Sequence, residues 1–338
     1  MVRANLSSRR VYLDLLRVIA IILVIYNHSA AFAIPRSEVY TLSGFMIYFM
    51  SSMCKVAVPL FFMISGALLL NREEDYIELY KKRVGRFVVI IVFFFLIQSI
   101  WRNVGGSVAN VKWFLSAYLM LLIFLPLIRI LARHMQNRDY LYLLLICCVV
   151  EMMIHVPYYF MYEMYPGIVA NSLFRPLGPD VPFTAGYGVF FMLMGRYSDI
   201  FLAKKMEKKL FRSSIAIGAF ICLIISTFVL YNVRNQELMG CFIAIPTISA
   251  YLWVKYLSEK VNITGHVGVL ISLMGGSVLT IMLTENICRD LVATYIIPLV
   301  RIPDAGYLVH LIHVMLSFVC ACVLGMLLKQ VPVVKKYL

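Results

Sequence analysis

Charged residues are scarce in this chain, since only 14% of its 338 residues are Asp, Glu, Lys or Arg and 62% are hydrophobic. Such a composition excludes a soluble globular protein, and continuous apolar runs of about 20 residues predict membrane-spanning helices instead. Hydrophobicity does not alternate along these runs as it would in the strands of a membrane barrel. We therefore expect an all-α polytopic membrane protein.

Metal-binding patterns are also lacking. The eight cysteines form no CxxC pair and show no Cys/His spacing, and most of them lie inside apolar runs. Buried cysteines of this kind behave as small apolar residues. We expect no metal site and no permanently bound cofactor.

Acidic residues are few, with 17 Asp and Glu against 31 Lys and Arg, so the net charge is +14. Such an excess of positive charge can indicate binding to nucleic acid, but Lys and Arg are also enriched in the short cytoplasmic loops of membrane proteins. Ten apolar spans fit the sequence: 11–33, 42–70, 84–101, 112–131, 140–160, 184–202, 211–232, 238–257, 267–288 and 306–328. With a cytoplasmic N-terminus, 22 basic residues fall on the cytoplasmic side and 7 on the other. We expect about ten transmembrane helices, both termini cytoplasmic and no nucleic-acid partner.

Sizeable segments outside the membrane are missing, apart from the proline-rich outer loop 161–183. No internal repeat of the kind found in inverted-repeat transporters is visible. We expect residues 1–338 to form a single integral-membrane domain. The sequence Ala31-Phe32-Ala33 resembles a signal-peptidase site, but Asp14 and Arg17 fit a signal peptide poorly, so we expect an uncleaved first helix.

The first span carries four polar residues, Asp14, Arg17, Asn27 and His28. On a helix, Arg17 and His28 share a face and lie about 16 Å apart along the axis, with Asp14 one turn before Arg17. Ionisable groups in hydrocarbon cost at least about 2.5–3.5 kcal/mol each, so they indicate a functional site by default. One interpretation is an Asp14–Arg17 pair at one surface and a helix-capping His28 at the other. The alternative is an active site in which His28 is the base.

Three further ionisable residues lie within later spans: Lys55 in the second, Glu151 in the fifth and Glu285 near the outer end of the ninth. Together with His28 they predict a polar cavity that opens outward. Pairwise neutralisation, of Lys55 with Glu151 or Glu285, is an equally good interpretation for Lys55 and Glu151.

Basic residues also cluster where the third span begins, at Lys81, Lys82, Arg83 and Arg86. Arg83 and Arg86 are three residues apart and face the same way, and arginine forks suit phosphate. Topology alone explains such a cluster too. Trp113, at the start of the fourth span, has the ordinary interpretation of an interfacial anchor.

These features fit more than one class of function. An enzyme could bind an anionic carrier from inside and deliver a group outside, using phosphate-binding arginines and a histidine base. A proton-coupled secondary transporter or exporter of a sugar or anionic substrate would use His28 and the carboxylates as a proton relay. A membrane sensor or scaffold is a third alternative, in which His28 and Arg83 would be dispensable.

Four motifs favour the enzyme. They are LDLLRVIAIILVIYNH at 13–28, VPLFFMISGALLL at 58–70, KRVGRF at 82–87 and VKWFLSAYLMLLIFLPLI at 111–128. In this order and at this spacing they resemble the first four helices of the integral-membrane acyltransferase 3 family, which O-acylates surface carbohydrates. The likeness extends over essentially the whole chain.

The resemblance implies a multi-pass enzyme of the bacterial cytoplasmic membrane. Its co-substrate would be a cytoplasmic acyl-CoA, most often acetyl-CoA, and its acceptor a hydroxyl of a surface glycan or lipid-linked sugar. By the same resemblance, His28 is the catalytic residue, Arg17 a donor-site or structural arginine and Trp113 part of the site lining. Arg83 and Arg86 would hold the CoA phosphates.

The sequence departs from the family where a histidine often ends the ninth-helix motif, because Thr284 and Glu285 stand there. Glu285 is therefore a candidate to orient His28. Lys55 is not a landmark of the family either, so it is a candidate contact for this protein's own acceptor. We expect Asn27 and Glu151 to support the acceptor side.

Overall fold

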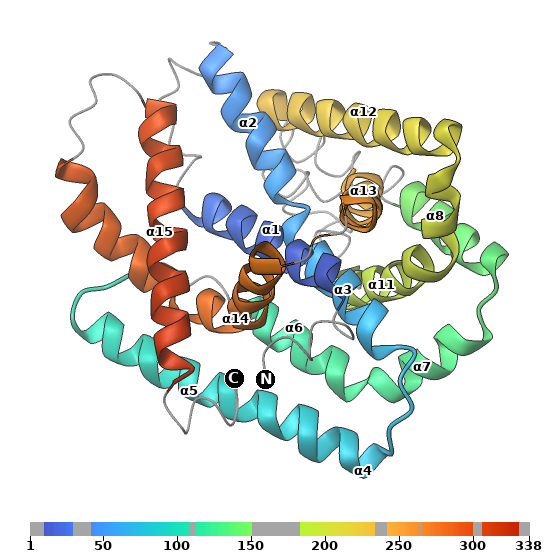
Figure 1. Cartoon of the computed structure of the whole chain (residues 1–338), viewed down its shortest axis with the longest axis horizontal. Coiled ribbons are helices and arrows are strands. Elements are labelled where there is room, and N and C mark those ends of the chain that lie inside the picture. The colour runs from blue at the N-terminus through green and yellow to red at the C-terminus, as the bar shows by residue number, and fades with distance from the viewer. Residues whose placement is uncertain are drawn as a thin grey trace, which may run out of the picture. The chain divides into compact units, whose positions relative to one another are not determined.

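The computed structural model describes residues 10–29, 42–107, 112–150, 183–233, 242–261, 263, 265–299 and 306–330. All regular structure in these ranges is helical, which confirms the expected all-α class. The α-helices, shown in Figure 1, are α1 (Val11–His28), α2 (Leu42–Cys54), α3 (Ala57–Leu69), α4 (Tyr76–Leu79), α5 (Gly85–Asn103), α6 (Lys112–Ile123), α7 (Leu125–His134), α8 (Asn137–Val150), α11 (Phe183–Tyr197), α12 (Lys209–Val233), α13 (Ala244–Val261), α14 (Gly265–Leu291) and α15 (Gly306–Leu328).

Short segments of π-helix and 3₁₀-helix continue several of these helices. The π-helix η3 (Tyr80–Val84) joins α4 to α5, and η6 (Ser198–Leu202) with the 3₁₀-helix η7 (Ala203–Glu207) follows α11. The π-helix η9 (Val292–Ile296) and the 3₁₀-helix η10 (Ile297–Leu299) prolong α14, so that Gly265–Leu299 is one candidate span of 35 residues.

Six stretches are long and apolar enough to cross a membrane, or seven if α6 and α7 count as one bent span, among the residues described. They cover the expected spans at 11–33, 42–70, 84–101, 211–232, 267–288 and 306–328, and the bent pair covers 112–131. The three remaining expected spans, 140–160, 184–202 and 238–257, correspond to α8, α11 and α13. The helices α8 and α11 are shorter than the candidate spans, and α13 ends in a charged segment. Residues 151–160 of the expected fifth span lie outside the described ranges.

Two expected spans are broken by proline. The axes of α6 and α7 meet at 64°, beside Pro126, which has no N–H to continue the backbone hydrogen bonds of α6. In the second span, Pro59 leaves the carbonyl of Lys55 without its helical partner, and α2 ends at Cys54. The N–H groups of Lys55 and Val56 there bond to carbonyls three residues back, at 3.3 and 3.1 Å.

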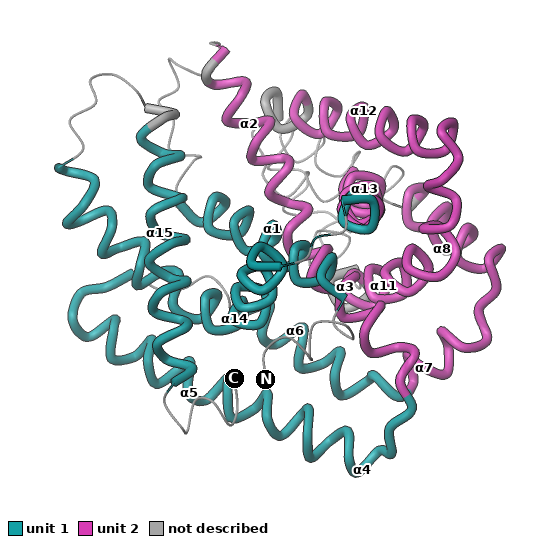
Figure 2. Tube along the Cα trace, viewed as in Figure 1, with its two compact units in different colours: residues 1–31, 73–126, 257–338 teal, residues 32–72, 127–256 magenta. Residues whose placement is uncertain are grey.

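The chain forms two compact units, coloured separately in Figure 2. Unit 1 comprises residues 1–31, 73–126 and 257–338, and unit 2 comprises residues 32–72 and 127–256. Unit 1 therefore contains α1, α4, η3, α5, α6, α14 and α15, which include the helices of His28, Arg83 and Glu285.

The centre of unit 1 is a layer of three helices, in which α14 packs against both α1 and α15. Gly275 permits a close approach to α1, because a Cβ atom there would stand 2.5 Å from the Cβ of Asp14. The two helices run parallel, since Asp14 lies against Gly275 and His28, further along, lies against Glu285. The helix α15 runs antiparallel to α14, with Gly325 beside Ile281.

Unit 2 is built around the pair α3 and α11. Gly66 and Gly195 let these two helices touch, because a Cβ at either position would collide with the backbone of Met192 or Met63. Arg196 then closes one end of the pair, since its side chain donates to Asn71 Oδ1 at 2.8 Å. It also donates to the carbonyl of Ala132 at 2.6 Å and to the hydroxyl of Tyr140 at 2.7 Å. These contacts indicate a structural role for Arg196.

Candidate functional site

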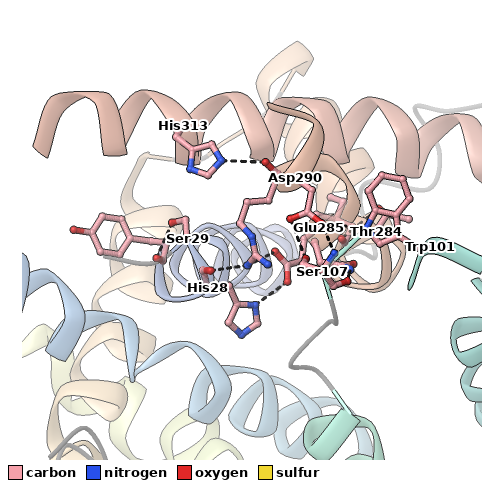
Figure 3. A network of polar contacts seen from close by, with 12 residues as sticks. His28, Ser29, Trp101, Ser107, Thr284, Glu285, Asp290 and His313 are labelled. Carbon is pink, nitrogen blue, oxygen red and sulfur yellow. Dashed lines mark hydrogen bonds and ion pairs between the residues drawn. The ribbon is translucent and has the colours of Figure 1, made fainter. Parts of the chain in front are cut away.

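His28 is the last residue of α1, and its imidazole faces Glu285 of α14 (Figure 3). The Nδ1 atom of His28 lies 2.7 Å from Oε1 of Glu285. An ionised carboxylate can only accept, so Nδ1 carries a proton and donates it, and in the neutral imidazole Nε2 then has a free lone pair. The Glu285 side chain is 1% exposed and that of His28 is 14% exposed, so the imidazole reaches the surface of unit 1 and the carboxylate does not.

Arg289 adds a third member to this group. Its Nη1 atom donates to the main-chain carbonyl of His28 at 2.6 Å and lies 3.6 Å from Oε2 of Glu285. Its main-chain carbonyl accepts from Nε2 of His313 on α15 at 3.1 Å. Side chains from α1, α14 and α15 therefore meet at one place, as Figure 3 shows.

A second histidine of α15 lies against the end of α1. His310 packs edge-on against the ring of Tyr26, with the ring centroids 4.9 Å apart. Its Nε2 atom lies 3.4 Å from the hydroxyl of Ser29, which itself donates to the carbonyl of Tyr26 at 2.9 Å. Three of the chain's six histidines thus gather at this end of unit 1.

The helix α5 is attached to the same end of α14. Gln98 and Asn286, both buried, exchange two hydrogen bonds at 2.9 and 3.0 Å. One turn further on, Asp290 accepts from the indole N–H of Trp101 at 3.1 Å and from the main-chain N–H and hydroxyl of Ser107 at 2.8 and 2.9 Å. These bonds attach α5 and the turn after it to the end of α14 that carries Glu285.

Asp14 and Arg17 form the ion pair that their spacing predicts, with Arg17 Nη1 2.6 Å from Asp14 Oδ1. Asp14 is buried, whereas the Arg17 side chain is 28% exposed. The pair lies about 16 Å along α1 from His28. The two polar groups of the first span therefore occupy opposite ends of the α1–α14 contact.

The basic cluster before α5 is paired with acidic residues. Arg83 donates to both carboxylate oxygens of Glu74, from Nε at 2.9 Å and from Nη2. Lys82 forms an ion pair with Glu78. Arg86 is exposed on the first turn of α5. The sequence analysis named neither Glu74 nor Glu78, although Glu78 stands four residues before Lys82, the usual spacing of a helical ion pair. Their carboxylates would compete with any phosphate that binds here.

Four predicted site residues remain, Trp113, Lys55, Asn27 and Glu151. Trp113 is exposed on α6 and packs edge-on against Phe114, with the ring centroids 6.3 Å apart. Lys55 belongs to unit 2, at the break between α2 and α3. Asn27 precedes His28, and its Oδ1 is buried with no hydrogen-bond partner within the described ranges. Glu151 lies outside the described residues.

Arg289, His310 and His313 were not among the site residues predicted from the sequence. Arg289 was counted only as an outer-side positive charge, although it stands four residues after Glu285 and so shares its helix face. His310 and His313 are likewise spaced to share one face of the last span. Helical spacing could have identified both relationships.

Comparison with known proteins gives one match. A family model described as an acyltransferase domain matches residues 10–329, nearly the whole chain. No curated protein and no solved structure matches it.

Proposed function

The chain belongs to the acyltransferase 3 family, and from this premise we propose that it transfers an acyl group, in the first place acetyl, from acyl-CoA to a hydroxyl of a cell-surface or lipid-linked glycan. The family and the apolar helices make it a membrane-associated acyltransferase with several candidate spans. The donor, the acceptor and the bacterial cytoplasmic membrane are part of the proposal.

The contact between His28 and Glu285 is the observation that carries this proposal. With Nδ1 donating to the carboxylate, Nε2 of His28 is available to take the proton of a sugar hydroxyl. The sugar oxygen then attacks the thioester carbonyl, and the C–S bond breaks as the new C–O bond is kept. The proton passes from Nε2 to the departing sulfur, so His28 and Glu285 return to their starting state.

A covalent route would use the same residue. In it, Nε2 of His28 attacks the thioester carbonyl, the C–S bond breaks and CoA leaves as the thiolate. The acyl group is carried on the imidazole until the sugar hydroxyl attacks it, and the hydroxyl proton passes through solvent to the thiolate, which restores the neutral imidazole. Both routes require an imidazole held in one orientation with Nε2 unprotonated. Glu285 supplies that orientation in either case, which is why a carboxylate at this position is compatible with activity.

The donor's phosphates would bind at the other end of unit 1. We assign them to Arg83 and Arg86, with Arg17 and Trp113 as further donor-site residues. Arginine forks give phosphate two parallel hydrogen bonds, as Arg83 now gives Glu74. A donor phosphate that binds Arg83 would therefore have to displace the carboxylate of Glu74. Asn27, Lys55 and Glu151 are proposed for the acceptor side, where Asn27 offers an unused buried oxygen.

Ten spans with both termini in the cytoplasm are the topology we propose for this enzyme. The distribution of 22 basic residues against 7 supports it. The parallel course of α1 and α14 supports it too, because the first and ninth spans of such a protein cross in the same direction. His28 and Glu285 would then both lie toward the outer surface.

Release of CoA by the detergent-purified protein tests the proposal. We expect the wild type to consume acetyl-CoA in the presence of crude surface glycan, with free CoA read by a thiol reagent, and His28→Ala to lose this activity while it still inserts and purifies. Normal turnover by His28→Ala would refute the role of His28. No CoA release by either protein would favour a transporter of sugars or anions instead.

A further inference from the structure

Arg289 is the residue of the His28 site to which neither the family resemblance nor the sequence pattern assigns a role. Its side chain is 15% exposed, and Nη1 contacts two different partners. It donates a hydrogen bond of 2.6 Å to the carbonyl of His28 and lies 3.6 Å from Oε2 of Glu285. The first contact is to the backbone of α1, and the second is an ion pair within α14.

The bond to the carbonyl of His28 fixes the position of the imidazole's own backbone. His28 is the last residue of α1, so its carbonyl has no N–H partner from a following helical turn. Arg289 provides that partner with a charged donor, and such bonds are shorter and stronger than neutral ones. The end of α1 is thereby held to α14 at the residue that carries the imidazole.

The contact with Glu285 balances a buried negative charge. Oε1 of Glu285 accepts from His28, whereas Oε2 is buried and has no hydrogen-bond partner within the described ranges. Among the described residues, Glu285 forms ion pairs with His28 and Arg289. Arg289 is therefore the permanent cation beside this carboxylate. A buried carboxylate without a counter-charge is strongly unfavourable, so loss of Arg289 should disturb the contact between Glu285 and His28.

The helix α15 fixes the arginine in turn. His313 donates from Nε2 to the carbonyl of Arg289 at 3.1 Å, so the backbone that carries the guanidinium is tied to a third helix. Other titratable groups at this end include His310, Asp290 and Cys288, which interacts with Cys320 and Cys322 of α15. His310 faces Ser29, and Asp290 is occupied by three donors from α5 and its turn. Cys288 is fully buried.

We propose that Arg289 is a positioning residue for acyl transfer, which fixes the backbone of His28 and supplies the counter-charge that keeps Glu285 a hydrogen-bond acceptor for Nδ1. The rate effects of this inference rest on the proposed function. The geometry that it describes does not, because the hydrogen bond between His28 and Glu285 can be observed without turnover.

The kinetic test compares Arg289→Gln and Arg289→Lys with Arg102→Gln. Arg102, exposed on the last turn of α5 in the same unit, is the matched control. We expect Arg289→Gln to lower kcat by about 10–100-fold, the usual loss when a residue that orients an active-site ligand is removed. The donor KM should stay within about twofold because the phosphates bind elsewhere. Arg289→Lys keeps the charge and should recover part of kcat, and Arg102→Gln should behave as wild type.

Rescue by the conservative variant separates this role from a merely structural one. Arg289→Lys keeps a cation beside Glu285, so its kcat should exceed that of Arg289→Gln at the same donor KM. Equal kcat values in the two variants, or a raised donor KM with an unchanged kcat in Arg289→Gln, would overturn the inference.

A proton NMR measurement provides a readout that needs no activity. An imidazole N–H donating to a carboxylate gives a strongly downfield signal, which we expect in the wild type and not in Glu285→Gln or His28→Gln. The signal should weaken in Arg289→Gln and persist in Arg289→Lys and Arg102→Gln. If the wild type showed this pattern of signals but released no CoA, the proposed function would be refuted, whereas the positioning of His28 and Glu285 by Arg289 would be supported. An Arg289→Gln protein with the wild-type signal and wild-type kcat would refute the inference alone.

Discussion

The two ends of unit 1 both contain ion pairs, but the pairs differ in what they leave available. At the end proposed to bind the donor, Arg17 and Arg83 are each bound to a carboxylate, Asp14 and Glu74, and a phosphate would have to displace at least one of these. At the histidine end, Glu285 contacts Nδ1 of His28, so Nε2, the nitrogen proposed for catalysis, takes no part in that contact. The first arrangement is suited to reversible binding, and the second to a fixed catalytic orientation.

Glu285→Gln should have the largest effect on kcat and so distinguish the two ends most clearly. The amide can donate to Nδ1 as well as accept from it, so the imidazole is no longer held in one tautomer. We expect kcat to fall roughly a hundredfold or more, with the donor KM little changed. Steady-state kinetics with varied acetyl-CoA measure both constants. A rise in donor KM at constant kcat would place Glu285 in binding and not in catalysis.

Arg83→Ala should change the donor KM and leave kcat close to wild type. Loss of charge-assisted hydrogen bonds to a phosphate costs about 1.5–3 kcal/mol, so the donor KM should rise by roughly 10–100-fold while kcat remains close to wild type. Arg133→Ala, an exposed cation on α7 of unit 2, is the control. An unchanged donor KM in Arg83→Ala would mean that membrane topology alone explains the positive charge of this cluster.

Glu74→Gln tests whether the acidic partner competes with the donor. The Glu74 side chain is 19% exposed and that of Arg83 is 25% exposed, so solvent weakens their attraction to about 1 kcal/mol or less. Removing the carboxylate should therefore lower the donor KM by a few-fold and leave kcat unchanged. A raised KM would mean that Glu74 orients Arg83 for the phosphate and does not compete with it.

Gly275→Ala addresses the contact that links the two ends. The added Cβ meets the backbone and Cβ of Asp14, so α1 and α14 must separate, at a cost of about 1–3 kcal/mol in the free energy of unfolding. Thermal melts in detergent measure this loss. Gly218→Ala, whose Cβ would lie 3.7 Å from Ile245, should be neutral or slightly stabilising. Equal melting temperatures for the two variants would show that α1 and α14 can move apart freely.

Helical spacing predicted well what lies within one span. The Asp14–Arg17 pair and the common face of Arg17 and His28 follow from residues three and eleven apart, and the structure contains the pair at 2.6 Å. The approach of His28 to Glu285 was a hypothesis drawn from a departure from the family pattern. Composition indicated the all-α class because only helices with internally satisfied backbones suit such apolar runs.

Contacts between distant parts of the chain could not be predicted in this way. Glu74 precedes Arg83 by nine residues across a change from α-helix to π-helix, so no helical period relates them. His313 meets Arg289 through the antiparallel packing of α15 on α14, and the register of that packing depends on small residues such as Gly325. Pro126 stands inside the expected span 112–131, but no bend was predicted there, and its angle of 64° depends on tertiary packing.

The length of the span that begins with α14 limits where the two substrates can meet. Its 35 residues extend about 50 Å, whereas the hydrocarbon core of a bilayer is about 30 Å thick. Glu285 lies about 30 Å from Gly265, so the helix continues well beyond the site. Under the proposed function and topology, a glycan of any length could remain in water while one hydroxyl reaches His28. The thioester would have to extend across nearly a full hydrocarbon thickness, so lipids with longer acyl chains should slow turnover by the reconstituted enzyme.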